Sequence, residues 1–453
     1  MSACMLWPLA WSQEIGGPDV RAFMLSIAAG LTVSSILFLV GRVTGQEERE
    51  LGDAIVATVM AWVTVSAIGA LPYWLGGYAA TFTDALFESV SAFTTTGATA
   101  LAAPCPRSVL FWRALTQWLG GAGVLLFGLW IMPLPQTGAR SDSPLAQLRM
   151  KPQTLRFYST RLLGVYSLLT AACCTLMAIG GITGFESLTG SFALLSTGGF
   201  PASVSSGSPW LTCAALFFMF VAGSSFMLHY RFLTGDFKSC LASEEFRLYS
   251  GIVAISALTI CADLVFHGIY PLREAAGRGL FQAAGVTTTT GYVGSFGLLP
   301  PYSRMLLFFL MFSGGCSLST AGGIKAMRLL ILWRQMRSGL TKLLHPQAVT
   351  RVRVDGMVVR EEVLDGVTSF FALYLALFLA GTMFASLLGA DLGSALYDVA
   401  SMLGNVGCPP GEAIGSYCSA SALRKWLYLV LMLLGRLELQ AVSLLLLPGA
   451  WRR

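Results

Sequence analysis

The sequence is poor in charge. Lys and Arg number 29 and Asp and Glu 23 in 453 residues, so charged residues make up 11% of the chain, against about 25% in an ordinary soluble domain. Hydrophobic residues make up 55%, and the mean hydropathy is +0.69. A soluble fold of this composition would expose large apolar patches, which excludes the soluble multidomain class that the length alone suggests. The composition predicts an integral membrane protein.

Groups suited to metal binding or catalysis are also scarce. The three histidines, His229, His267 and His345, are too scattered for a metal site, and no Ser, Cys or Asp stands beside one at catalytic spacing. A polytopic membrane enzyme, the alternative class, would need paired carboxylates or a nucleophile and a base at membrane depth. The sequence therefore predicts a protein that is not an enzyme and carries no cofactor.

The ten cysteines do not form a disulfide framework. Five lie within apolar runs, where cysteine acts as a small apolar residue: Cys173, Cys174, Cys213, Cys261 and Cys316. A Cys408–Cys418 bridge in an outer loop stays open, since such bonds persist in oxidising compartments. Residues 3–11 are apolar but follow no basic residue, so they make a poor signal peptide. They look like the end of a helix that begins before Met1.

Long apolar runs are abundant. About 20 apolar residues of helix cross the roughly 30 Å hydrocarbon core of a bilayer. Nine runs qualify: 22–41, 51–77, 110–133, 162–184, 210–230, 249–266, 305–324, 367–390 and 426–447. They predict one leading helix and four helix pairs.

Lys and Arg gather in alternate connections, at residues 140–161, 231–247 and 334–360. Cytoplasmic loops carry the excess of these residues. The N-terminus is therefore expected outside and the C-terminus, which ends Trp451-Arg452-Arg453, in the cytoplasm. The net charge of +6 then indicates anchoring to the inner leaflet of the lipid bilayer, and no nucleic-acid binding is expected.

A short segment ending in glycine lies between the helices of each pair. Aligning the four glycines exposes an internal repeat: Gly97, Gly198, Gly291 and Gly407. The residue before each is β-branched: Thr96, Thr197, Thr290 and Val406. The residue before that is small and polar: Thr95, Ser196, Thr289 and Asn405. A polar residue also stands nine positions before each glycine: Glu88, Thr189, Gln282 and Asp398. The shared unit is predicted to be a short helix followed by an extended turn.

Four such turns indicate a common polar axis. Non-helical backbone at membrane depth is tolerated only where it is buried in protein or lines a watery cavity. A β-branched residue next to glycine favours extended backbone whose carbonyls point the same way, and rings of carbonyl oxygens can replace the hydration shell of a cation. The C-terminal end of each short helix also favours a cation. Any single turn could be a plain re-entrant corner, but four in register favour an ion pathway.

The predicted fold is an all-α polytopic membrane protein. It consists of four repeats, each a helix, a re-entrant pore loop and a helix, around a pseudo-fourfold pore. The leading helix occupies residues 1–50, and the repeats occupy 51–140, 141–238, 239–345 and 346–453.

Two further features are candidates for a gate. The run 313–323 contains Gly314, Gly315, Gly322 and Gly323, and each helical glycine costs about 1 kcal/mol relative to alanine. It should break the helix into a loop that blocks the pore; close helix packing is the alternative. Lys325, at the inner end of this run, is a candidate for the gate or, alternatively, a lysine that snorkels to the membrane surface. Arg436 lies near the middle of the last run, where a charge is usually functional. It is expected to face the axis or, alternatively, to pair with another helix.

Several motifs together resemble the TrkH/KtrB/HKT potassium transporters, most of all the bacterial TrkH subgroup, over nearly the whole chain from Asp53 onward. They are FESVSAFTTTGAT at 87–99, FWRALTQWLGGAGV at 111–124, LSTGGF at 195–200, FMLHYRFLTGD at 226–236, TTTTGY at 287–292, STAGGIKAMRLL at 319–330, HPQAV at 345–349 and LGRLE at 434–438. Two departures stand out. Only one helix is complete ahead of the first repeat, and Gly407 is followed by Cys408-Pro409-Pro410.

The resemblance implies potassium uptake across the bacterial inner membrane through a filter formed by the four turns. It also implies a homodimer with one pore in each protomer, a gating loop below the filter, and a cytoplasmic nucleotide-binding ring, TrkA, that controls opening. A sodium-selective or non-selective relative of the same fold is the alternative.

Overall fold

The computed structural model describes residues 1–12, 18–43, 51–101, 105–131, 152–199, 208–291, 296–347, 350–407, 417–437 and 439. Within these ranges the chain is helical apart from loops and one two-stranded hairpin, which confirms the all-α prediction. Six helices among them are long and apolar enough to cross a membrane: Asp19–Leu39, Val56–Leu75, Arg107–Leu129, Leu155–Ile179, Glu244–Phe266 and Glu361–Leu387.

The leading part comprises two short 3-10 helices, η1 (Ser2–Leu6) and η2 (Pro8–Trp11), and the helix α1 (Pro18–Val43). The 3-10 helices occupy the residues expected to end an earlier helix; whether one precedes them stays a prediction. The ring of Trp11 packs against Phe111. This contact fastens the N-terminal segment to the first repeat.

The first repeat contains α2 (Leu51–Leu75), the short helix α3 (Phe82–Phe93) and α4 (Arg107–Ile131). The second contains α5 (Pro152–Ile179), the short helix α6 (Gly184–Leu195), α7 (Pro209–Gly223), α8 (Phe226–Leu233) and α9 (Phe237–Ala242).

The span predicted at 210–230 is not one continuous helix, because α7 and α8 meet at 103°. Ser224 and Ser225 between them have extended backbone. The Ser224 hydroxyl donates to the carbonyl oxygen of Val221 at 2.8 Å. Such local bonds compete with the backbone hydrogen bonds of a helix, and this one lies at the break between α7 and α8.

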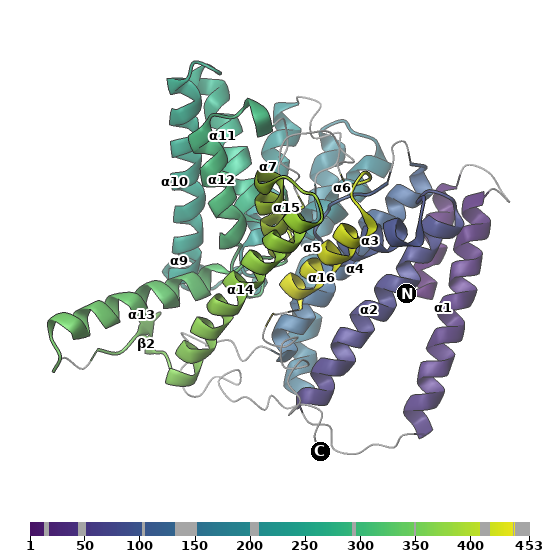
Figure 1. Ribbon diagram of the computed structural model, residues 1–453, viewed down its shortest axis with the longest axis horizontal. Coiled ribbons are helices and arrows are strands. Elements are labelled where there is room, and N and C mark those ends of the chain that lie inside the picture. Colours follow the sequence, from purple (N-terminus) through teal and green to yellow (C-terminus); the bar gives the residue numbers. More distant parts are fainter. Residues whose placement is uncertain are drawn as a thin grey trace.

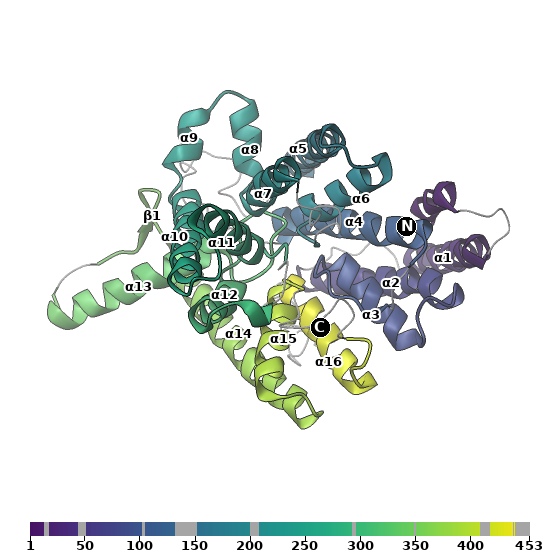
Figure 2. The same ribbon diagram turned by 90° about the horizontal axis from the view of Figure 1, so that it is seen from above.

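The third repeat contains α10 (Glu244–Phe266), the short helix α11 (Leu272–Thr287), η4 (Phe296–Leu298), α12 (Pro301–Ser313) and α13 (Ala326–Leu344). The span predicted at 305–324 therefore stops at Ser313, at the start of the glycine-rich run. Beyond that run α13 extends away from the rest of the molecule (Figures 1 and 2).

The fourth repeat begins with the hairpin of β1 (Arg353–Val354) and β2 (Met357–Val358), which are antiparallel with Arg353 opposite Val358. It continues with α14 (Glu361–Leu387), the short helix α15 (Leu392–Gly404) and α16 (Ala422–Arg436). Most of the last predicted span beyond Arg436 lies outside the described residues.

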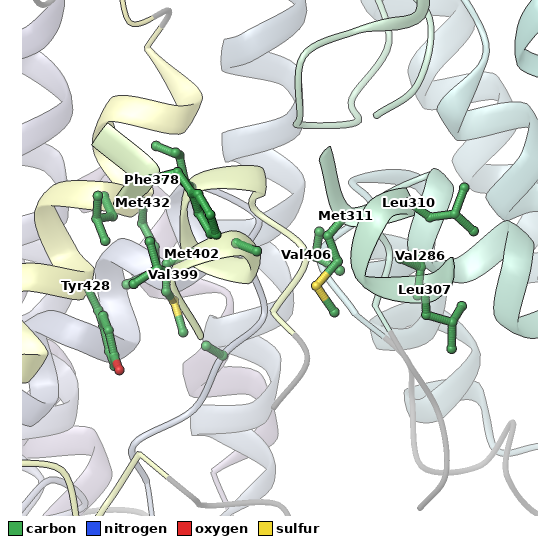
Figure 3. Close-up of a cluster of buried hydrophobic side chains, with 14 of the residues drawn as sticks. Val286, Leu307, Leu310, Met311, Phe378, Val399, Met402, Val406, Tyr428 and Met432 are labelled. Atoms are coloured by element: carbon green, nitrogen blue, oxygen red, sulfur yellow. The ribbon is translucent and has the colours of Figure 1, made fainter. Parts of the chain in front are cut away.

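Figure 2 shows the four groups following one another around the centre of the molecule: α2–α4, α5–α7, α10–α12 and α14–α16. The largest buried apolar cluster joins the third and fourth groups, with Val286, Met311, Phe378 and Met432 among its members (Figure 3). The four short helices α3, α6, α11 and α15 each belong to a different one of these groups. The domain limits at residues 50, 140, 238 and 345 remain predictions.

Candidate functional site

The four short helices end in the same backbone turn. The side chains of Thr81, Thr183 and Asp391 cap the starts of α3, α6 and α15 by accepting backbone N–H groups. At the other end one non-glycine residue in each segment is left-handed: Thr95 (φ 53°), Thr197 (φ 56°), Thr289 (φ 57°) and Asn405 (φ 53°). Such a conformation costs about 1–3 kcal/mol and persists where its surroundings enforce it, often at functional sites.

This turn corrects the predicted alignment of the second segment by one residue. Thr197, not Ser196, has the conformation of Thr95. The N–H groups of Thr96, Gly198 and Val406 each donate to the carbonyl five residues earlier, so Gly198 corresponds to Thr96. The glycines with positive φ at the next position are Gly97 (81°), Gly199 (134°), Gly291 (114°) and Gly407 (78°). The counterpart of Gly97 is therefore Gly199. The sequence alignment failed because two adjacent glycines permit either register.

The same shift changes the residue nine positions before the glycine. In the second segment it is Gly190 and not Thr189, so the predicted polar position is wrong there. In the other three segments the residue at this position is polar, as predicted: Glu88, Gln282 and Asp398.

The turns lie against one another in space. A Cβ on Gly97 would overlap the carbonyl oxygen of Gly198, and one on Gly407 would overlap the carbonyl oxygen of Thr96. The Asn405 Nδ2 donates to Thr96 Oγ1 at 3.0 Å. Repeats two and three also meet, since a Cβ on Gly223 would lie 2.7 Å from the Thr288 side chain. The structure thus brings the predicted residues of the four turns together, and every non-glycine residue among them is buried.

Side-chain oxygens at the left-handed positions form the inner part of the site. Thr197 Oγ1 donates to the carbonyl oxygen of Thr320 at 2.9 Å, and Thr289 Oγ1 accepts from the N–H of Gly322 at 2.8 Å. Thr95 Oγ1 and Asn405 Oδ1 are buried without a hydrogen-bond partner in the described part of the chain. Buried oxygens without partners are costly unless water or an ion binds them. The cluster can therefore offer oxygen ligands to a cation.

Polar side chains support the turns from behind. Glu88 accepts from Thr99 Oγ1 at 2.9 Å, from the N–H of Ala100 at 3.1 Å and from Arg113 at 3.3 Å. Gln117 Nε2 donates to the carbonyl oxygen of Gly198 at 2.7 Å, so that oxygen already has one protein partner. The sequence pattern marks Glu88 as a repeated polar position but does not indicate its partners, which lie 11, 12 and 25 residues further along the chain.

A buried ion pair closes the ring between the first and fourth repeats. Lys425 of α16 lies 2.5 Å from Asp84 of α3, with the side chains 6% and 9% exposed. Lys425 Nζ also donates to the carbonyl oxygen of Cys418 at 3.0 Å. No sequence pattern indicates this pair, because Lys425 is simply one of the basic residues expected in an outer loop.

The glycine-rich run 314–325 is non-helical, which confirms that it breaks the helix. Gly314 and Gly323 have φ of 67° and 72°. The run lies directly under the turns, since it supplies Thr320 and Gly322 to the site. The Lys325 side chain folds back onto the glycine-rich run, because its Nζ donates to the carbonyl oxygens of Ser319 and Ala321.

Arg436 ends α16 and is 4% exposed. A Cβ on the preceding Gly435 would lie 3.0 Å from Asn405 Oδ1, so Arg436 follows directly below the fourth turn. None of its guanidinium nitrogens has a hydrogen-bond partner among the described residues, and no ion pair found there includes it. These observations favour the axial position over a structural ion pair.

Histidines and cysteines add little to the site. In the residues covered by the structure, no three His, Cys, Asp or Glu side chains group as a metal site. The Cys418 thiol donates to the carbonyl oxygen of Ala100 at 3.0 Å. Its suggested partner Cys408 lies outside the described residues.

Comparison with known proteins decides the family. The TrkH profile, described as a cation transport protein, matches residues 21–249 and 251–448. The chain belongs to the TrkH family. The Trk system potassium uptake protein TrkH of Salmonella typhimurium is 32% identical over 95% of this chain and 92% of its own length. The Trk system potassium uptake protein TrkI of Halomonas elongata is 32% identical over 96% and 91%.

Solved structures agree with this assignment. The crystal structure of the potassium transporter TrkH from Vibrio parahaemolyticus has a TM-score of 0.91 to this chain at 29% identity. The match covers 100% of this chain and 96% of that one. The TrkH fold therefore extends over the whole chain, including the four turns and the run beneath them.

Proposed function

We propose that this TrkH-family chain takes up potassium through a filter formed by the four turns. The supporting observation is the left-handed residue repeated in all four turns, with buried oxygens beside it. On the corrected register the ligands are Thr95, Thr96 and Gly97; Thr197, Gly198 and Gly199; Thr289, Thr290 and Gly291; and Asn405, Val406 and Gly407. The names of the relatives support potassium as the transported ion.

The gate in this proposal is the run 314–325, hereafter the gating loop, together with Arg436. The contacts of Thr320 and Gly322 with the turns support a blocking position. Arg436 adds a positive charge below the filter that slows leak. A cytoplasmic TrkA-like nucleotide-binding ring would release the block, with the C-terminus on its side of the bacterial inner membrane and the N-terminus outside.

The functional unit is proposed to be a homodimer. The helix α13 extends from the bundle (Figure 1) and carries exposed apolar side chains at its end, namely Leu340, Leu343 and Leu344. A second copy would cover this surface. The mass of the purified protein in detergent tests the dimer.

Flux of potassium, rubidium and sodium into liposomes that contain the purified protein tests the transport proposal. Potassium and rubidium should enter faster than sodium, because a glycine in each of the four turns leaves no side chain to narrow the filter. Equal entry of sodium would favour the non-selective alternative, and no entry above protein-free liposomes would reject transport.

Gly97→Ser sharpens this test, since φ of 81° and the nearby Gly198 carbonyl leave no room for a side chain. Selectivity should fall. Gly77→Ser is the matched control: Gly77 has φ of 72°, but no atom within 4 Å of an added Cβ. It should keep the wild-type ion preference. If both variants lose selectivity alike, the loss reflects backbone strain anywhere in the chain and not the filter.

A further inference from the structure

Two adjacent carboxylates at the start of α10 face different parts of the molecule. Glu245 is 6% exposed, and its Oε1 accepts from the N–H of Ser317 in the gating loop at 2.6 Å. It also accepts from the backbone of Met327, with Lys325 nearby. Ser317 lies early in the gating loop and Met327 just after its end, so one carboxylate ties both ends of the loop.

We propose that Glu245 is a positioning residue that holds the gating loop in its blocking position, and that Glu244 couples this hold to the hairpin of β1 and β2. The proposal rests on the proposed function, because it assigns a latch to the gate named there.

The chemistry suits a latch. A carboxylate that accepts several N–H bonds makes charge-assisted hydrogen bonds, which are stronger than neutral ones. The gating loop has no helical bonds of its own in this stretch and depends on outside contacts. Besides the contacts of Thr320 and Gly322 with the turns, they include the Glu245 bonds and the bond from the N–H of Cys316 to the carbonyl oxygen of Gly223 at 2.8 Å. The N–H of Phe226 also donates to the carbonyl oxygen of Leu318 at 2.9 Å.

Glu244 makes the connection to the hairpin. Its N–H donates to Asp355 Oδ1 at 2.8 Å, and its Oε2 accepts from the N–H of Asp355 at 2.8 Å. Arg334 of α13 also donates to that Oε2 at 2.8 Å. Asp355 lies at the tip of the hairpin, so the hairpin, α13 and the start of α10 are bonded together. A shift of the hairpin and α13 would pull Glu245 from Ser317.

Cys316 provides a native reporter, because it is in the gating loop and fully buried. The test reconstitutes the full chain in liposomes and measures two quantities: the rate at which N-ethylmaleimide modifies Cys316, located by mass spectrometry, and basal potassium flux. In Glu245→Gln both should rise about tenfold, since a hydrogen bond to a charged group is worth about that factor or more. The order of ion preference should not change. Glu244→Gln should raise both quantities less.

Two matched controls separate a latch from general loosening. Glu274→Gln removes an exposed carboxylate of α11 that pairs only with Arg278 in this part of the structure, and it should behave as wild type. Cys173, which is also fully buried, should stay unmodified in every variant. Faster modification of Cys173 together with Cys316 would mean that the protein has loosened as a whole, which overturns the proposal.

The latch proposal is also overturned if Glu245→Gln shows the wild-type rate of Cys316 modification and the wild-type flux. If that variant does not insert, Glu245→Asp keeps the charge and retracts the carboxylate by one methylene; it should shift both quantities in the same direction, and wild-type behaviour there overturns the latch. Deleting residues 317–321 separates the two proposals. If the deletion raises flux and Glu245→Gln does not, the gating loop is still the gate, and the latch proposal is wrong. If the deletion does not change flux but Cys316 is modified faster in Glu245→Gln, Glu245 does hold the loop in place, and the proposed gate is wrong.

Discussion

At the scale of single residues, the turns depend on backbone conformation more than on side-chain identity. Thr95, Thr197, Thr289 and Asn405 share one left-handed conformation, although threonine disfavours it as a β-branched residue. Neighbouring contacts therefore enforce it. Residue patterns could predict that a turn stands at these places, but not which of two adjacent glycines takes the positive φ.

The corrected register makes a direct prediction for the second turn. Gly199→Ala should impair potassium flux more than Gly198→Ala, because only Gly199 has a φ, 134°, that a side chain rarely tolerates. The strain is about 1–3 kcal/mol. In Gly198→Ala the new Cβ meets mainly the Gln117 side chain at 3.0 Å, which can shift. Flux in liposomes measured for both variants checks this order, and the reverse order would restore the sequence alignment.

Arg436 is predicted to limit the rate of conduction. Its guanidinium stays protonated, and at an effective dielectric of about 20 two unit charges 4 Å apart repel by roughly 4 kcal/mol. Arg436→Gln should therefore raise potassium flux and leave the ion preference unchanged. Arg436→Lys, which retains the charge, should stay close to wild type. Unchanged flux in Arg436→Gln, or loss of folding, would instead point to a structural role.

At the scale of elements, the sequence predicted helix breaks where glycine is dense and missed one where it is not. The gating loop was predicted because Gly314, Gly315, Gly322 and Gly323 stand in a run. The 103° bend between α7 and α8 was missed, because Ser224 and Ser225 are ordinary residues in an apolar run. A tertiary contact accompanies the local Ser224 bond at this bend: the N–H of Phe226, the first residue of α8, donates to the carbonyl oxygen of Leu318 in the gating loop.

Deleting residues 317–321 should open the gate. The deletion removes Thr320, which accepts from Thr197 Oγ1 at 2.9 Å and donates to the carbonyl oxygen of Leu195 at 2.9 Å. Basal potassium flux without any regulatory ring should rise. Thr320→Ala removes only the hydroxyl, which donates to the carbonyl oxygens of Leu195 and Ala222, and should raise flux less. A deletion variant that inserts, folds and conducts no better than wild type would show that the run only packs helices.

At the scale of the whole molecule, the repeats predicted the ring but not the contacts that close it. Internal repetition is visible because each repeat carries the same short helix and turn. Closure depends on pairs such as Asp84 and Lys425, which are 341 residues apart in the chain. The four turns include neither residue, so their partnership follows only from the fold. The same holds for Glu245 and Ser317.

The Asp84–Lys425 pair should therefore stabilise the ring as a unit. Lys425→Met leaves the Asp84 carboxylate buried without its partner, and breaking a buried pair on one side costs about 3–5 kcal/mol. Asp84→Asn should have a similar effect, though Asn keeps an oxygen for the Thr81 cap. The double variant should recover much of the loss, because neither charge is then left alone.

Thermal unfolding of the four proteins in detergent, followed by tryptophan fluorescence, measures this cycle. Arg278→Met provides the control, since Arg278 and Glu274 form an exposed pair with side chains 52% and 48% exposed, and exposed pairs contribute about 0–1 kcal/mol. It should leave the melting temperature nearly unchanged. If the single and double variants at Asp84 and Lys425 lose stability additively, the two residues act separately, and the ring is closed by the turns themselves through Gly407 and Thr96.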